Sequence, residues 1–166
     1  MAKALFISTD DVKRKSILKG NLDVDNFIQY IEVAQDIHIQ NYLGTDLYDK
    51  ISADILASTL AGDYLTLTTN YIKPMLIHWS VVEALPFIAY TADNIGITRR
   101  DAENSTSADK TEIDFLVEKA RIIASYYTDR FVAYICENSD SFPEYSTNTD
   151  SDVKPSTDTN FTGWVI

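Results

Sequence analysis

The side chains that could support chemistry are few in this chain and lie far apart in the sequence. A zinc or di-iron site needs several His, Cys or carboxylate ligands at short spacings, such as a Glu-x-x-His pair. No such pair occurs, and neither His38 nor His78 has a second ligand at a metal-binding spacing. His78 and Glu83 are five residues apart, which puts them on different sides of a helix. The sequence therefore predicts no metal site.

The sequence patterns of nucleophilic catalysis are missing as well. A serine hydrolase needs a Gly-x-Ser-x-Gly elbow, and a phosphate-binding loop needs a Gly-rich segment after a strand. Neither pattern is present. Cys136 is the single cysteine and lies in an apolar helical pattern, which indicates a buried thiol and excludes an intrachain disulfide. We therefore predict no catalytic, cofactor-binding or metal-binding residues, and a protein that is not an enzyme.

Two polar residues inside apolar patterns have a structural interpretation. His38 interrupts an apolar stripe, where a hydrogen-bonded imidazole can replace an aliphatic side chain. Glu83 is the one carboxylate expected to be buried, and a buried charge needs a partner. We predict that Glu83 pairs with Arg121 or Arg130.

Charge and hydropathy exclude further classes. The formal net charge of −11 argues against a surface that grips nucleic acid, which rests on clustered Lys and Arg. The basic run at residues 13–15 is interpreted as a solvated helix face, with a phosphate-binding patch as the alternative. The longest apolar stretch, residues 75–90, is shorter than the roughly 20 residues that a bilayer requires. With no secretory signal pattern at the start, the sequence predicts synthesis in the cytoplasm and no membrane span.

Helices are the elements that would position these side chains. A short first helix follows Ser8 and ends near Gly20. Residues 25–42 show a helical apolar stripe that includes Ile37, and Gly44 is expected to cap its end. Further helices are predicted over residues 45–61 and 64–91, with a kink or split near Pro74 and near Pro86.

Residues 94–108 interrupt the helical pattern. β-branched residues and turn formers alternate there, so we predict an extended or hairpin excursion. Ile95 and Ile97 lie in it and offer apolar surface beyond a single core, which makes them candidate subunit-interface residues.

The last helix, capped by Thr111, carries apolar residues on two sides. A second ridge of Phe115, Ile122 and Tyr126 lies opposite its core stripe, and a lone domain needs only one apolar face. The ridge is a candidate subunit contact, or it is covered inside a large helical bundle. The core stripe is predicted to contain Ile113, Leu116, Val117, Ala120, Ile123, Ala124, Tyr127, Phe131, Tyr134 and Ile135.

A polar arm with an apolar tip ends the chain. Residues 1–145 are predicted to form a helical body, and residues 146–166 an extended arm too polar to fold alone. Exposing the larger apolar side chains of the tip costs about 1.5 to 3 kcal/mol each. We predict an arm that is disordered in the free subunit and docks on a partner through Phe161, Trp164, Val165 and Ile166.

Several local motifs together resemble the helical head-tail connector proteins, also called adaptor or neck-ring proteins, of tailed bacteriophages. The order and spacing of these motifs, rather than any one of them, carry the resemblance. They are Ala34-Gln35-Asp36 with His38-Ile39 leading to Leu43-Gly44 and Leu47-Tyr48, then Asn94-Ile95-Gly96-Ile97 to Glu103-Asn104-Ser105, and Tyr126-Tyr127 leading to Glu137-Asn138-Ser139 and Phe142-Pro143-Glu144-Tyr145.

This resemblance implies an all-α fold: a helical bundle with a small β-hairpin or extended excursion and an extended C-terminal arm. It also implies a ring, typically of twelve subunits, in the neck of the virion between the capsid portal and the tail. The expected partners are the portal protein, a tail or second neck-ring protein, and viral DNA that passes through the lumen without sequence-specific binding. The alternatives are a helical binding module outside the virion and a helical enzyme built on scattered residues such as Glu83, Asp129 and Arg130.

Overall fold

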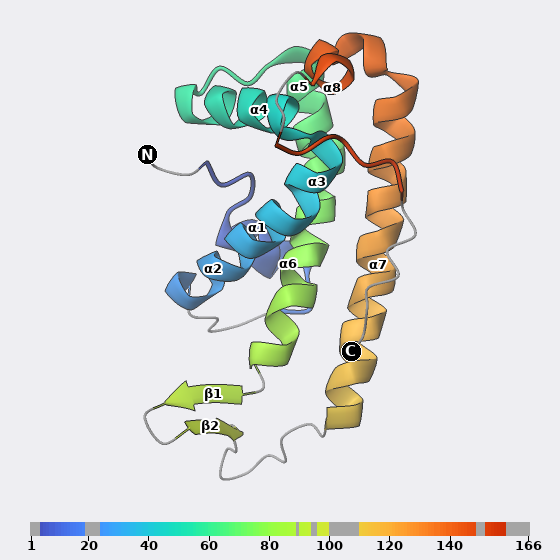
Figure 1. Ribbon diagram of the computed structural model, residues 1–166. Coiled ribbons are helices and arrows are strands. Elements are labelled where there is room, and N and C mark those ends of the chain that lie inside the picture. The colour runs from blue at the N-terminus through green and yellow to red at the C-terminus, as the bar shows by residue number, and fades with distance from the viewer. Residues whose placement is uncertain are drawn as a thin grey trace.

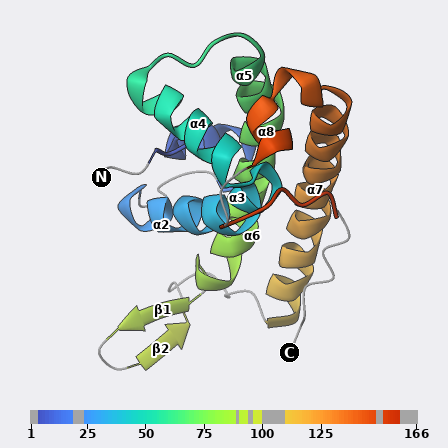
Figure 2. The same ribbon diagram turned by 45° about the horizontal axis from the view of Figure 1, so that its top comes forward.

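Figure 1 shows a computed structural model of the chain. The structure describes residues 4–18, 24–88, 90–93, 96–99, 110–148 and 152–158. Helices form the body of the protein, so the prediction of an all-α fold is confirmed. Two long helices, α6 (Lys73–Ile88) and α7 (Lys110–Glu137), lie side by side along the length of the molecule in both ribbon views (Figures 1 and 2).

The central helical rod contains α6. It begins with α5 (Gly62–Leu67) and passes through a π-helical turn, η2 (Thr68–Ile72), into α6. The wide turn lies just before Pro74, which lacks an amide donor, so the predicted disturbance at this proline takes the form of a π turn. Pro86 does not split the helix, because α6 continues to Ile88.

A second rod crosses α6 and also contains a π turn. Its parts are α2 (Val24–Ala34), η1 (Gln35–Ile39) and α3 (Gln40–Leu43). The prediction that Ile37 faces the core is wrong, because Ile37 is 50% exposed. A π turn holds more residues than an α turn, so it rotates Ile37 outward while Gln35, His38 and Ile39 are buried.

The remaining N-terminal helices have clear end signals. In α1 (Thr9–Lys15), Ser8 and Asp11 form a reciprocal capping box, and α1 ends before the predicted Gly20. α4 (Thr45–Ala57) follows Gly44 directly, as predicted, and ends at Ser58 in the left-handed conformation rather than at Gly62.

The rest of the described chain completes the two ends of the molecule. At one end, β1 (Tyr90–Asp93) pairs antiparallel with β2 (Gly96–Arg99), so the helix predicted to reach residue 91 ends at Ile88 instead. At the other end, α7 is followed by η3 (Ser139–Ser141) and α8 (Pro143–Thr147).

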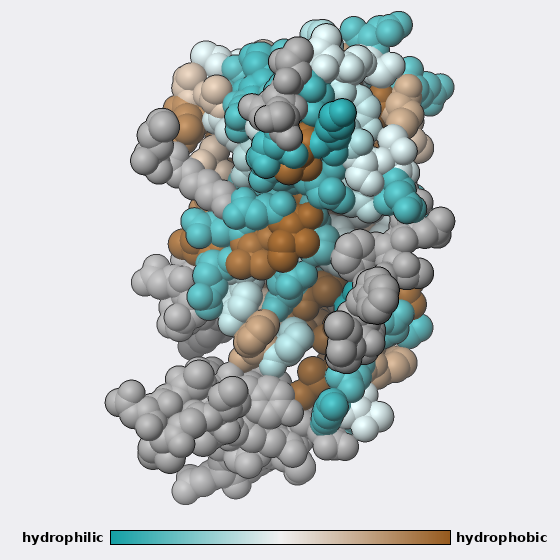
Figure 3. All heavy atoms as spheres, viewed as in Figure 1, coloured by the Kyte–Doolittle hydropathy of each residue, from teal (hydrophilic) through white to brown (hydrophobic). Residues whose placement is uncertain are grey.

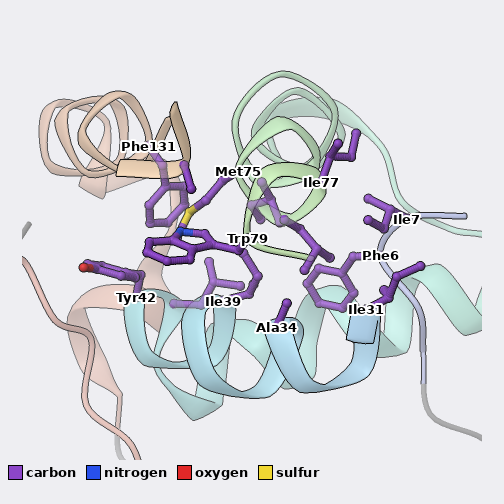
Figure 4. Packing of buried hydrophobic residues seen from close by; sticks show 14 of the residues in the cluster. Phe6, Ile7, Ile31, Ala34, Ile39, Tyr42, Met75, Ile77, Trp79 and Phe131 are labelled. Atoms are coloured by element: carbon purple, nitrogen blue, oxygen red, sulfur yellow. The ribbon is translucent and has the colours of Figure 1, made fainter. Parts of the chain in front are cut away.

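The core lies where α6 meets its neighbours. Trp79 of α6 is 2% exposed and lies between Phe131 of α7 and Ile39 of η1 (Figure 4). Phe6 and Ile7, from the segment before α1, close the other side of the same core (Figure 4). One apolar core therefore joins segments from the N-terminus to α7, and it fixes the surfaces described next.

Candidate functional site

The second ridge of α7 is exposed in the folded subunit. Phe115 is 61% exposed, Ile122 54% and Tyr126 58%. The opposite side of the helix, with Ala124 and Phe131, is buried against α6. α7 thus has two apolar sides, and the residues that the structure describes bury only one of them.

Two residues assigned to the core stripe belong to the exposed side instead. Leu116 and Ile123 are both more than two-fifths exposed, so their prediction as core residues is wrong. They lie a heptad apart and beside the ridge, and Leu116 lines an open groove with Thr111, Glu112 and Phe115. We call Phe115, Leu116, Ile122, Ile123 and Tyr126 the α7 outer face.

The inner side of α7 is held against α6 by stacked rings and by a buried hydrogen bond between the two helices. The Trp79 indole N–H donates to the Thr128 hydroxyl at 3.0 Å, which in turn donates to the Ala124 carbonyl at 3.0 Å. His78 stacks on Tyr127, with ring centroids 4.8 Å apart, and burial lowers the pKa of His78. These contacts fix the rotation of α7 about its axis, so the α7 outer face points away from α6.

Buried His38 pairs with Glu83, which is partly exposed, with 28% of its side chain accessible, rather than buried as predicted. The His38 Nε2 and Glu83 Oε1 atoms are 2.9 Å apart, and the His38 ring stacks on Trp79 with centroids 3.8 Å apart. The predicted pairing of Glu83 with Arg121 or Arg130 is therefore wrong. Arg121 instead lies 3.8 Å from Glu118, its neighbour one turn back.

Arg130 lies over rings rather than at a carboxylate. Its guanidinium is 5.7 Å from the Tyr71 ring centroid and 5.9 Å from that of Tyr127. Tyr71 also stacks on Tyr134 at 4.0 Å. Glu83 and Arg130, both named for the enzyme alternative, thus take part in packing between helices.

A buried glutamine fastens the N-terminal segment to η1. Gln35 Nε2 donates to the Ala4 carbonyl at 2.8 Å and to the Tyr48 hydroxyl at 2.7 Å, and Gln35 Oε1 accepts from the Phe6 N–H at 3.0 Å. The Phe6 and Tyr48 rings stack at 5.2 Å. Sequence reasoning assigned no role to Gln35, because its partners are distant in the chain.

Residues 152–158, which we call the C-terminal segment, bind the chain's own helices. The Thr45 N–H donates to the Val153 carbonyl at 3.0 Å, and the Val153 N–H donates to the Thr45 hydroxyl at 3.1 Å. The Ser156 N–H donates to the Asn41 carbonyl at 2.9 Å. We call the receiving residues, Asn41, Tyr42, Gly44 and Thr45, the arm-binding surface.

Side chains lock both ends of this contact. The Tyr42 hydroxyl donates to the Asp158 carbonyl at 2.9 Å, and burial, followed by the nearby carboxylates of Asp158 and Asp129, raises the pKa of Tyr42. Asn148 Nδ2 donates to the Val153 carbonyl at 3.1 Å, and its Oδ1 accepts from the Asp46 N–H at 3.3 Å.

Gly44 makes this close approach possible. Its φ is +73°, and a Cβ atom there would lie 2.7 Å from two ring carbons of Pro155 and 2.9 Å from Asn148 Oδ1. Any other residue would collide with the C-terminal segment as well as strain the backbone. The glycine that ends α3 is therefore also the point where the arm touches the body.

These contacts correct the predicted arm. Residues 143–147 form α8, and the Tyr64 hydroxyl donates to Glu144 Oε2 at 2.6 Å; burial, followed by this hydrogen bond, raises the pKa of Tyr64 to about 12. Because residues 152–158 pack on α3 and α4, the expectation of an arm that is disordered in the free subunit does not hold for them. Phe161, Trp164, Val165 and Ile166 lie outside the described residues, as does Ile95, and Ile97 is described in its backbone only.

A second exposed apolar patch was missed at the sequence level. Val33 is 42% and Phe87 61% exposed, and the Phe87 ring stacks on Tyr30 at 5.7 Å. Figure 3 shows hydrophobic residues over α2 and η1, surrounded by hydrophilic ones. We call Tyr30, Val33, Ile37 and Phe87 the α2 patch. The π turn and the end of α6 bring these residues together, which periodicity alone does not reveal.

Two further observations concern chemistry. Cys136 is exposed, so its predicted burial is wrong. Among the residues that the structure describes, no three His, Cys, Asp or Glu side chains gather as a metal-binding group. Within the same residues, no helix combines the length and the apolar character needed to cross a bilayer.

The chain matches, over residues 39–155, a protein family described as a family of unknown function (DUF6712). The match covers more than half of the 166 residues and runs from the π turn η1 to the C-terminal segment. No curated protein and no solved structure matches the chain. The chain belongs to the DUF6712 family.

Proposed function

We propose that this member of the DUF6712 family is a structural virion protein that forms a ring in the neck of a tailed bacteriophage. The ring joins the capsid portal to the tail or to a second neck-ring protein, and it lets viral DNA pass. In this proposal the protein is not an enzyme, it is made in the host cytoplasm, and it works as a closed ring, typically of twelve subunits.

The observation that carries the proposal is the α7 outer face. Phe115, Ile122 and Tyr126 recur at helical spacing and remain more than half exposed after the subunit has built its core. Contiguous exposed apolar surface on a soluble chain marks an interaction site. A protein that forms a ring needs such a face for its neighbour.

The motif resemblance is the reason for proposing a virion neck rather than another assembly. The motifs that resemble head-tail connector proteins run from residue 34 to residue 145, largely the region of the family match. The net charge of −11 suits a lumen through which DNA slides without binding, because few cations are available to hold phosphates. The hairpin and the apolar residues after Asp158 are the parts expected to reach neighbouring subunits or the portal, since residues 152–158 bind their own subunit.

A reconstruction of the particle that contains this chain tests the proposal. The expected result is a closed ring of copies at the portal vertex, with the α7 outer face buried between them. A single copy per neck, or absence from the neck, would contradict the proposal. If mass spectrometry found the chain in infected cells but not in purified particles, the alternative of a binding module outside the virion would replace it.

A further inference from the structure

The described part of the chain leaves two separate apolar surfaces exposed. One is the α7 outer face, where Ile122 is 54% exposed, and the other is the α2 patch, where Ile37 is 50% exposed. The α7 outer face repeats its apolar residues along one helix, with Phe115 and Ile122 seven apart and Tyr126 four further on. The α2 patch combines three residues of the α2–η1 rod with Phe87 of α6. Each surface is an apolar stripe that another helix can meet.

The two surfaces lie on different sides of α6. In both ribbon views, α2 and α7 flank α6 from opposite sides (Figures 1 and 2). A single copy therefore cannot close one surface with the other. A contact between two different surfaces of identical chains is heterologous, and it closes into a ring when the rotation between copies permits.

Charge distinguishes the two surfaces. The sequence from residue 20 to residue 49 contains no Lys or Arg, and Glu32 and Asp36 border the α2 patch. The α7 outer face carries Lys119 in its middle, with its ammonium 5.7 Å from the Phe115 ring centroid, and Glu112 at the end of the face, beside Phe115 and Leu116. The Lys119 ammonium of one copy can thus approach the carboxylates of Glu32 and Asp36 beside the α2 patch of another copy.

The same charges disfavour a symmetric pairing of two α7 helices. If the α7 outer faces of two copies met about their centre, Lys119 would lie near the Lys119 of the other copy. Like charges brought together at an interface oppose that pairing. The α2 patch is therefore the better complement for the α7 outer face.

We propose that the α7 outer face of one copy binds the α2 patch of the next copy, and that this heterologous contact builds the ring. The inference rests on the proposed function, because it names the surfaces through which neighbouring subunits of that ring meet. The occupant of each surface is a second copy of this chain.

Disulfide trapping between two single-cysteine variants tests the contact directly. In the full-length chain with Cys136→Ser, one variant carries Ile37→Cys and the other Ile122→Cys. The two are mixed at high concentration and oxidised. A control pair combines Ile122→Cys with Leu56→Cys, since Leu56 is an equally exposed apolar residue on α4. We expect about a tenfold excess of the mixed crosslink over the control pair, because a specific contact raises the effective concentration of the thiols.

The outcomes separate the inference from the proposed function. A mixed crosslink no more frequent than the control, or crosslinks only between two Ile122→Cys chains, would overturn the inference even if rings are seen in virions. A strong mixed crosslink together with absence of the chain from the virion neck would leave the contact in place and overturn the proposed function.

A charge reversal provides an independent readout. Lys119→Glu in the Ile122→Cys chain should lower the mixed crosslink yield roughly threefold, and Glu32→Lys in the Ile37→Cys chain should restore it. Lys119 and its neighbours on the α7 outer face are exposed, so folding should be unchanged, as circular dichroism would verify. A loss of yield that Glu32→Lys does not restore would contradict the assigned pairing.

Discussion

The arm-binding surface and the α7 outer face lie on the same subunit, yet the described chain covers only the first. The arm-binding surface offers backbone groups that need partners, the Asn41 carbonyl and the Thr45 N–H, and the C-terminal segment supplies them. The α7 outer face offers only side chains, because its backbone groups are already bonded within the helix.

This difference affects how specific each contact can be. Hydrogen bonds to the backbone fix the register of the C-terminal segment, and Gly44 admits Pro155 at one position only. An apolar stripe along a helix accepts a partner at several registers, so its specificity must come from charges such as Lys119. The first surface is closed within the subunit, and the second is suited to a partner.

Substitution of Gly44 should have the largest effect. Gly44→Ala should lower the free energy of unfolding by about 3 kcal/mol, because the new Cβ strains the backbone and displaces Pro155. Gly62→Ala is the matched control, since Gly62 also has a positive φ but nothing lies within 4 Å of its added Cβ. It should cost about 1 kcal/mol. Equal losses in chemical denaturation would mean that the contact with the C-terminal segment adds nothing.

Removal of the C-terminal segment should have the next largest effect. A chain ending at Asn148 should lose about 2 kcal/mol, because several hydrogen bonds are lost and the released ordering entropy offsets part of them. Helix content by circular dichroism should change little, and amide exchange at Thr45 should speed up.

A second truncation separates the C-terminal segment from the tip. A chain ending at Asp158 keeps the hydrogen bonds to Asn41, Tyr42 and Thr45 and should retain the stability of the full chain. If the chain ending at Asp158 lost as much stability as the chain ending at Asn148, the last residues rather than the C-terminal segment would hold the arm in place.

A single hydroxyl tests the same contact with less disturbance. Tyr42→Phe removes the donor to the Asp158 carbonyl and should cost about 1 kcal/mol. Tyr126→Phe is the control on the other surface, where the side chain is 58% exposed, and thermal unfolding should barely change. A larger loss for Tyr126→Phe would show that the α7 outer face packs within its own subunit.

The α7 outer face should matter for association and hardly at all for folding. Phe115→Ser with Ile122→Ser should change the free energy of unfolding by less than about 0.5 kcal/mol, because both side chains are mostly exposed. Self-association measured by light scattering should fall strongly, whereas Leu56→Ser should leave it unchanged. A loss of stability without a loss of association would mean that the α7 outer face serves folding rather than a partner.

Metal removal should have the smallest effect of all. His38 belongs to η1, which leads directly into the arm-binding surface. Its Nε2 atom is within hydrogen-bonding distance of Glu83, and its ring stacks on Trp79. A chelator should therefore leave the unfolding midpoint unchanged. Stoichiometric zinc or iron that is lost on His38→Ala would contradict the structural role.

The sequence by itself determined the features that depend on local order. Helical periodicity predicted the all-α class, a second apolar ridge of Phe115, Ile122 and Tyr126 opposite the core stripe, and the end of a helix at Gly44. Each of these follows from the 3.6-residue repeat or from the backbone freedom of glycine, which neighbouring residues reveal. Nothing distant in the chain was needed to infer them. Whether that ridge is covered or exposed was left open by the sequence.

Only the tertiary structure decided the features that join distant residues or break the repeat. Glu83 meets His38 rather than an arginine, and Ile37 turns outward, because the π turn η1 shifts the side-chain register against α6. The polar C-terminal segment binds its own subunit because the end of α3 leaves a glycine and backbone groups free to receive it. Composition predicts which segments are polar, and periodicity predicts which residues share one face of an ideal helix. The partner of a side chain depends instead on how the helices pack against one another.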